Sequence, residues 1–181
     1  TENVINRLPY GKVYILDQTH SELIDYPSIY QNFKKDIYEG LQDGLKQIKK
    51  YQKIILLYNE ERQPEGILEG FNLFCAQYGI QNKIINTLTD RELFKGELYI
   101  ILDDKNLIRI IKRIKDEHLI LAKDIGIISY NDTLLKEIVE GGITTISTNF
   151  NLMGERLAEM ILNSEFAQVE NPNRLILRKS L

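Results

Sequence analysis

Residues 124–154 read DIGIISYNDTLLKEIVEGGITTISTNFNLMG, and this stretch decides the fold. The β-branched run at 125–130 predicts a buried strand, which stops abruptly at the polar corner Asn131-Asp132-Thr133. A short helix, a crossing strand at 143–147 and a helix capped by Asn149 are predicted to follow. Ligands of open α/β sheets lie at the carboxyl ends of parallel strands, so this corner is the first candidate for a binding site.

The rest of the chain alternates strands with helices. Strands are predicted at 12–16, 53–58, 83–85, 97–102 and 174–178. Helices are predicted at 32–50, 67–78, 90–95, 107–114 and 153–162, with loops or linkers at 1–11, 19–27, 59–66 and 164–172. Such an order predicts an α/β fold with three αβα layers, a mainly parallel sheet and right-handed crossovers.

Composition narrows the class of protein. The chain has 181 residues, a net charge of -3 and a pI near 5.5, which gives no sign of nucleic-acid affinity in this chain itself. Cys75 lies in an apolar helical run, which predicts a buried thiol and favours a reducing compartment. No apolar run reaches the roughly 18 residues of a membrane span, and residues 1–20 lack a signal-peptide pattern. We therefore expect a cytoplasmic protein without membrane contact.

Three motifs carry a family resemblance. Residues 124–132 (DIGIISYND) resemble the "DIS-hydrophobic-GFDD" signature of LacI-type repressor sensor domains. Residues 143–146 (ITTI), followed by Gly154 and Ala158, resemble the "LTT-V…G..A" segment of that family, and residues 175–180 (LILRKS) resemble its closing "LVVR-S". The three motifs occur in the family's order, and the resemblance runs from Val13 to Leu181.

The resemblance implies a type I periplasmic-binding-protein fold, in which two Rossmann-like lobes close on a small ligand. The family domain is longer than this chain, so the chain is expected to be its C-terminal lobe. The implied division is a linker and hinge strand at 1–17, the C-terminal lobe at 18–146, a crossing segment and first-lobe helix at 147–165, and a returning strand at 166–181. The first lobe and the DNA-binding head would lie outside it.

Residues 30–33 (YQNF) and 129–133 (SYNDT) resemble the variant whose sensor follows a GntR-type winged helix. This variant implies a homodimeric transcriptional regulator that senses a neutral monosaccharide such as fucose or arabinose. No catalytic activity and no cofactor are expected. The implied mechanism is allosteric, because the ligand shifts a dimer between states that differ in DNA affinity.

The resemblance also implies five ligand-binding residues, which are Asn131, Asp103, Asn32, Phe150 and Tyr130. Asn131 stands where the family has an Asp that binds ligand hydroxyls, although an Asx turn would explain it as well. Asp103 and Asn32 match polar family positions, and each is also a natural helix N-cap. Phe150 matches an aromatic of the ligand cleft, and Tyr130 is expected to lie half in the core and half in the cleft wall.

One position departs from the family pattern. The family carries a ligand-gripping Arg three residues before Gly-Phe, whereas Ile67 precedes Gly70-Phe71 here. A neutral and less polar ligand, such as a deoxy sugar, would suit this change.

Two other classes of function remain open. The first is a sugar-binding protein of a transport system, which the missing export signal and the terminal R-x-S motif disfavour. The second is an enzyme or a phospho-receiver, which the pair Asp103-Asp104 suggests. The isolated His20 and His118 have no spacing typical of a metal site.

Overall fold

The structure, a computed structural model, describes residues 5, 8–18, 21–89 and 91–181. The chain forms two compact units. Unit 1 comprises Thr1–Asn32 and Thr148–Asn173, and unit 2 comprises Phe33–Ser147 and Arg174–Leu181.

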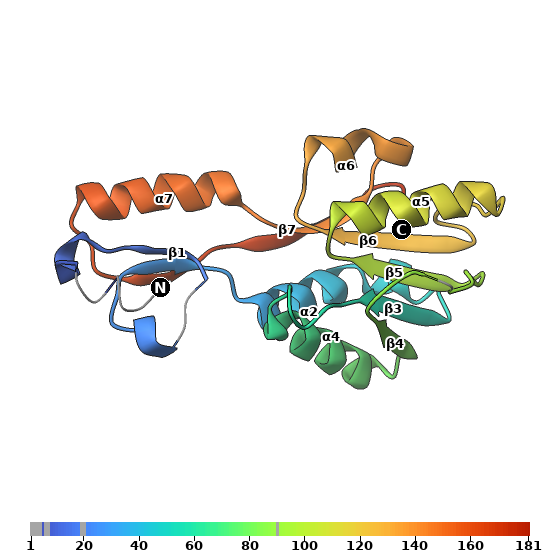
Figure 1. Cartoon of the computed structure of the whole chain (residues 1–181), viewed down its shortest axis with the longest axis horizontal. Helices are drawn as coiled ribbons and strands as arrows, with labels where there is room; N and C mark the ends of the chain where they lie inside the picture. The colour runs from blue at the N-terminus through green and yellow to red at the C-terminus, as the bar shows by residue number, and fades with distance from the viewer. Residues whose placement is uncertain (1–4, 6–7, 19–20, 90) are drawn as a thin grey trace. The chain divides into compact units, whose positions relative to one another are not determined.

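Unit 2 is built on a parallel sheet (Figure 1). Among the described residues its strand order is β4-β3-β5-β6-β7-β9. The strand bounds are β3 (Lys53–Leu57), β4 (Asn82–Ile85), β5 (Glu97–Ile101), β6 (Ile125–Tyr130), β7 (Thr144–Thr148) and β9 (Asn173–Ile176). The pairings of β3 with β4 and β5, of β5 with β6 and of β6 with β7 are all parallel, which confirms the predicted α/β class.

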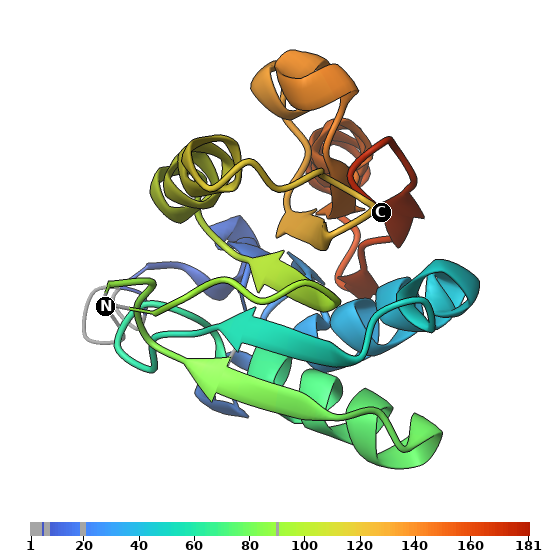
Figure 2. The same cartoon turned by 90° about the vertical axis from the view of Figure 1, so that its right-hand side faces the viewer.

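Three helices cover one face of this sheet (Figure 2). They are α2 (Phe33–Asp43), α3 (Leu45–Ile48) and α4 (Glu65–Tyr78). Alternate strand residues such as Ile54 and Leu56 point to this face and pack with Phe71 and Phe74 of α4. Cys75 lies in the same core, as predicted, and burial raises the pKa of its thiol to about 12.

The opposite face packs against α5 (Asp104–Asp116), α6 (Leu134–Ile138) and the 3₁₀ turn η3 (Val139–Gly141). Ile55 and Leu57 point to this side and form a second core with Ile110 of α5. Two ion pairs join α5 to the α6–η3 segment, because Lys136 Nζ lies 2.9 Å from Asp104 Oδ1 and Lys115 Nζ lies 2.5 Å from Glu140 Oε1. The predicted three layers are therefore present in unit 2.

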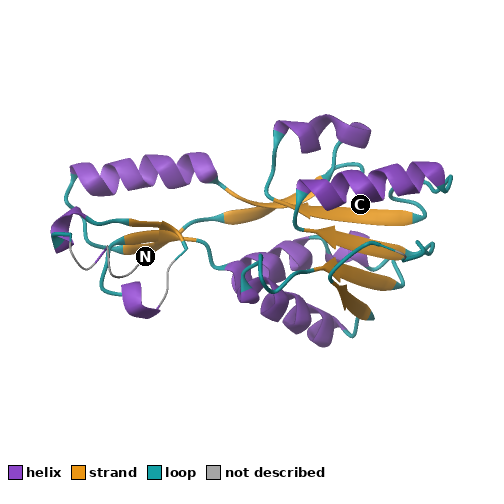
Figure 3. Ribbon diagram, viewed as in Figure 1, coloured by secondary structure: helices purple, strands orange, loops and turns teal. Residues whose placement is uncertain are grey.

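Unit 1 contains a smaller parallel sheet with one long helix beside it (Figure 3). Within the described residues the sheet has the order β1-β2-β8. The elements are η1 (Tyr10–Lys12), β1 (Ile15–Asp17), η2 (Ser21–Leu23), β2 (Ser28–Tyr30), α7 (Phe150–Leu162) and β8 (Gln168–Glu170). Ile29 of β2 packs with Met153 and Met160 of α7 in its core.

Two predicted helices differ from the structure. The helix predicted at 32–50 is broken at Gly44 into α2 and α3, because glycine is about 1 kcal/mol less favourable than alanine inside a helix. The helix predicted at 90–95 is absent from residues 91–95, and Asp90 lies outside the described residues. In this segment the Arg91 guanidinium instead donates to Glu97 Oε1 at 2.5 Å and to the Tyr99 hydroxyl at 3.2 Å, and both of these partners lie on β5.

The strand β8 lies in the segment 164–172 that was predicted to be a linker, and β2 lies between the loop predicted at 19–27 and the helix predicted at 32–50, where no element was predicted. Since β2 pairs with both β1 and β8, these two strands belong to the small sheet of unit 1. The two units divide the chain after Asn32, Ser147 and Asn173, and the predicted division into lobe segments at 17, 146 and 165 stays a prediction. Across the described residues, no helix combines the length and the apolar character that a membrane crossing requires.

Candidate functional site at the strand ends of unit 2

The carboxyl ends of β5 and β6 bring two of the predicted site residues to one edge of the sheet. The two strands are paired in register from Glu97 and Ile125 to Ile101 and Ser129, so their ends lie at the same level. Asp103 follows β5, and Asn131 follows β6. We name Asp103, Asp104 and Asn131 the strand-end rim.

Asn131 adopts an unusual backbone conformation at this rim. Its φ is +60°, in the left-handed region that asparagine tolerates better than most residues. Its backbone N–H donates to the Ile146 carbonyl at 2.8 Å, which ties the corner to β7. Its side-chain Oδ1 is buried and has no hydrogen-bond partner among the described residues. An unpaired buried acceptor is costly, so this atom is ready to accept a hydrogen bond from an added donor.

Asp103 caps the helix that follows it. Its carboxylate accepts from the Asn106 backbone N–H at 2.9 Å and from the Asn106 side-chain amide at 2.7 Å. The predicted N-cap is thus confirmed, whereas its proposed ligand contact stays a prediction. Both carboxylate oxygens already accept hydrogen bonds, so this group offers a ligand less free capacity than Asn131 does.

Tyr130 lies in the core between the sheet and the α2–α4 layer. Its side chain is 4% exposed, and its hydroxyl is buried with no partner among the described residues. Burial, together with the charge of Asp36, raises the pKa of this hydroxyl. The ring therefore contributes to the core, and its contact with a ligand stays a prediction.

The remaining two candidates belong to other parts of the chain. Asn32, the last residue of the first segment of unit 1, donates its side-chain amide to Glu170 Oε2 at 3.0 Å. Phe150 begins α7 and is 47% exposed. Asn149 caps that helix by accepting from the Leu152 N–H at 3.0 Å, as predicted.

Ile67 occupies the first turn of α4 and is 3% exposed in the core of unit 2. Its side chain fills space between the sheet and the helices and presents no polar group. The structure therefore accounts for Ile67 as a core residue.

Sequence reasoning missed the side chain that joins the two ends of the rim. The Nζ of Lys136 donates to the carbonyls of Tyr130 and Asn131 at 2.7 and 2.8 Å and pairs with Asp104 at 2.9 Å. The apolar pattern of a five-residue helix gives no signal for such an inward lysine, because its partners come from a strand end and from another helix.

Sequence reasoning also missed the partner of Arg178. Its guanidinium donates to both carboxylate oxygens of Asp132, at 2.6 and 2.8 Å, and Asp132 also accepts from the Thr145 hydroxyl at 2.9 Å. These bonds hold the pKa of the Asp132 carboxyl below its usual value. A second link runs from the Thr144 N–H to the Ser180 hydroxyl at 2.8 Å. The three sequence motifs thus meet in one network behind the rim.

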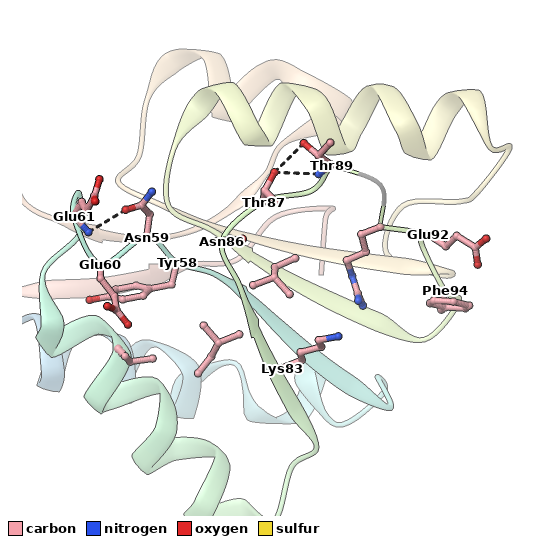
Figure 4. A pocket seen from close by; sticks show the side chains of 14 residues that line it. Tyr58, Asn59, Glu60, Glu61, Lys83, Asn86, Thr87, Thr89, Glu92 and Phe94 are labelled. Atoms are coloured by element: carbon pink, nitrogen blue, oxygen red, sulfur yellow. Dashed lines mark hydrogen bonds between the residues drawn. The ribbon is translucent and has the colours of Figure 1, made fainter.

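A separate open pocket lies beside the ends of β3 and β4 (Figure 4). Its volume is about 1120 Å³, and residues 58–61 and 83–94 contribute most of its lining. Turns build its wall, since Asn59 Oδ1 accepts from the Glu61 N–H at 2.9 Å and the Thr87 and Thr89 hydroxyls lie 2.9 Å apart. None of the five predicted site residues lines this pocket.

Solved structures with a similar fold are known. A transcription regulator-like protein from Staphylococcus haemolyticus superposes with a TM-score of 0.78 at 17% identity, over 99% of this chain and 70% of that one. A dimeric Lac repressor gives 0.74 at 18% identity, over 99% and 71%. A LacI-family transcriptional regulator from Enterococcus faecium with bound ribose gives 0.73 at 20% identity, over 92% and 69%. At these identities the likeness establishes the fold alone.

Sequence comparison gives a more specific assignment. No curated protein matches the chain. Residues 48–181 match the family described as the periplasmic binding protein-like domain, and this match spans the whole of the large sheet and the three motifs. Since the match covers most of the chain, the protein belongs to the periplasmic binding protein-like domain family.

Proposed function

We propose that this chain is the effector-sensing part of a bacterial transcriptional regulator, in which a small sugar binds at the strand-end rim and controls DNA binding. The observation that carries the proposal is the buried Oδ1 of Asn131 at the end of β6, which has no hydrogen-bond partner in the described part of the chain, in a member of a binding-protein family. An unsatisfied acceptor costs about 1–3 kcal/mol, which a ligand hydroxyl would recover. The ribose bound to the Enterococcus faecium regulator supports a sugar as the class of ligand.

The proposed ligand is a neutral monosaccharide such as fucose or arabinose. The charges at and behind the rim have partners within unit 2, because Asp104 pairs with Lys136 and Asp132 pairs with Arg178. The buried Ile67 brings no cation to the ligand. A charged ligand would therefore need counter-charges that these pairs already use.

In this proposal unit 2 is the C-terminal lobe, and unit 1 carries the segments that pack with the first lobe. Asn32 and Phe150, which belong to unit 1, stay candidate ligand residues in this proposal. A GntR-type winged-helix head outside this chain would bind DNA in the cytoplasm. The sugar would act by binding one state of the regulator more tightly than the other, as any ligand-driven shift of states requires.

Asn131→Ala is expected to weaken sugar binding about tenfold or more, because a hydroxyl of the ligand loses its acceptor. Calorimetric titration of fucose, arabinose, xylose, galactose and ribose measures this, with the protein extended at its N-terminus through the proposed first lobe. Asn82→Ala is the matched control, since Asn82 starts β4 at the amino end of the sheet. If Asn131→Ala and the unchanged protein bind a sugar with equal affinity, the sugar does not bind at the strand-end rim. Nanomolar binding by the 181 residues alone would contradict the two-lobe mechanism.

We further propose that the regulator is a homodimer that uses the outer face of α5 and α6. This face carries exposed apolar side chains, namely Ile108 (58%), Leu134 (82%), Leu135 (42%) and Ile138 (74%). The two ion pairs between α5 and the α6–η3 segment keep the two elements side by side. Exposed apolar side chains on neighbouring elements are typical of a protein interface, and the dimeric Lac repressor among the similar structures supports a second copy as the partner.

Ile138→Asp is expected to convert the dimer to monomer, raising the dissociation constant about 100-fold, because a carboxylate would lose its hydration at the interface. Sedimentation equilibrium measures this. The control is Ile24→Asp, which places the same charge at a 63% exposed isoleucine of unit 1. A monomeric unchanged chain, or a dimer that survives Ile138→Asp, would rule out this interface.

A further inference from the structure

The helix α6 exposes apolar side chains and buries a charged one, which is the reverse of an ordinary amphipathic helix. Its apolar residues Leu134 and Ile138 are 82% and 74% exposed, whereas Lys136 is 2% exposed. Removing an ammonium group from water costs several kcal/mol unless good partners replace the water. The position of Lys136 is therefore set by what its ammonium contacts and not by the burial of apolar surface.

The contacts of Lys136 use the full capacity of its ammonium group. An ammonium has three N–H donors. They face the Tyr130 carbonyl at 2.7 Å, the Asn131 carbonyl at 2.8 Å and Asp104 Oδ1 at 2.9 Å. The first two acceptors are consecutive carbonyls of the chain where β6 ends, and the third belongs to the first residue of α5.

The two carbonyls belong to the peptide units on either side of the Asn131 Cα. Asn131 has a φ of +60°, which costs a residue with a side chain up to about 1–2 kcal/mol relative to ordinary backbone conformations. Donors that bind both flanking carbonyls at once oppose rotation about the Asn131 backbone bonds. The helix also points Lys136 at this corner, because the Lys136 N–H donates to the Thr133 hydroxyl at 3.3 Å in the N-cap.

We propose that Lys136 is the positioning residue of the rim: its buried ammonium holds the Asn131 backbone in the left-handed conformation and links it to Asp104, so that the Asn131 side chain is presented in one fixed orientation. The role of this orientation in recognising a sugar rests on the proposed function. The positioning itself is a property of the free protein. Pre-organisation of this kind raises affinity, because the ligand does not spend binding energy on ordering the site.

The variant Lys136→Met keeps an unbranched side chain of similar length and removes all three donors. We expect it to release Asn131 from its left-handed conformation. In isotope-labelled protein, the three-bond HN–Hα coupling and the Cα chemical shift of Asn131 report this change directly. A role in stability alone would lower the melting temperature and leave both signals of Asn131 where they are.

Two further variants separate the contacts. Lys115→Met removes the other ion pair between α5 and the α6–η3 segment, whose lysine is 61% exposed, and touches no rim carbonyl. It is expected to leave the Asn131 signals unchanged. Asp104→Asn removes the carboxylate partner of Lys136 and keeps both carbonyl bonds, so it is expected to shift the Asn131 signals less than Lys136→Met does.

Unchanged Asn131 signals in a folded Lys136→Met protein would overturn the proposal. If Lys136→Met does not fold, Lys136→Leu removes the same three donors with a shorter apolar side chain, and unchanged Asn131 signals there would overturn the proposal equally. For any sugar that the calorimetric panel identifies, Lys136→Met is expected to weaken binding about tenfold. If no sugar of the panel binds, the proposed function fails for that panel, while the test of positioning in the free protein stands.

Discussion

Gly70→Ala is expected to destabilise unit 2 by about 3 kcal/mol or more. A Cβ built at Gly70 would lie 2.1 Å from the Lys34 carbonyl oxygen and 2.6 Å from Cγ2 of Ile37. The nearer atom is backbone, so α2 and α4 would have to move apart. Their contact closes one face of the sheet, and its loss would open the core around Phe71 and Phe74.

Urea denaturation followed by circular dichroism measures this effect. The matched control is Gly154→Ala, which also adds a methyl group inside a helix but, beyond the adjacent residues and backbone of its own helix, meets no atom of the described residues within 4 Å. That variant is expected to be neutral or to stabilise α7 by up to about 1 kcal/mol, because alanine is the better helix former. A Gly70→Ala protein as stable as the unchanged chain would mean that the two helices do not approach this closely in solution.

The predicted features that the structure confirms are those determined by local sequence. The buried strands at 53–58, 97–102 and 125–130 are continuous apolar runs, and runs of that length in an alternating chain specify a parallel sheet. The helix end predicted after residue 78 and the helix caps predicted at Asp103 and Asn149 are also correct. Each of them depends on a side chain or a φ value within a few residues of the helix.

Features set by long-range contacts could not be predicted in this way. The strands β2 and β8 have three residues each, which is too short for a readable alternation, and each is defined by pairing with a distant segment. The segment before β5 was predicted to be helical from its local sequence. Its non-helical course is stabilised by the hydrogen bond from Arg91 to Glu97, which the local sequence does not indicate. In both cases tertiary pairing overrides local preference.

The rim shows the same division between local and long-range information. Its residues could be identified from the sequence, because polar residues directly follow buried strands. The contacts of Lys136 that stabilise the rim could not be identified in this way, since Lys136 contacts carbonyls five and six residues earlier in the chain and a carboxylate on another helix. The family motifs are explained in the same terms, because Arg178 and Asp132 stand 46 residues apart and meet only in the folded sheet.

Arg178→Met is expected to destabilise unit 2 by about 2–3 kcal/mol at pH 7, because it leaves the Asp132 carboxylate without its two-bond partner. The side chains of Arg178 and Asp132 are only 16% and 26% exposed, so water replaces the guanidinium poorly. The control is Lys34→Met, which breaks an ion pair whose side chains are 54% and 47% exposed and should cost at most about 1 kcal/mol. Equal losses for the two variants would contradict a special role for the Arg178 network.

The pH dependence gives this prediction a second and independent test. The folded protein holds the pKa of Asp132 below its unfolded value, chiefly through the hydrogen bond from Arg178. The ionised carboxylate therefore contributes stability that is fully present above the unfolded pKa of about 4 and is lost as the pH falls through the lower folded pKa. In Arg178→Met the part of this contribution that comes from Arg178 is absent at every pH, while the Thr145 hydroxyl and the charge of Lys136 remain. The stability difference between the two proteins, measured by urea denaturation from pH 7 to pH 3, should thus narrow on the acidic side. A difference that stays constant over this range would show that Arg178 stabilises the corner through packing of its side chain and not through the charge of Asp132.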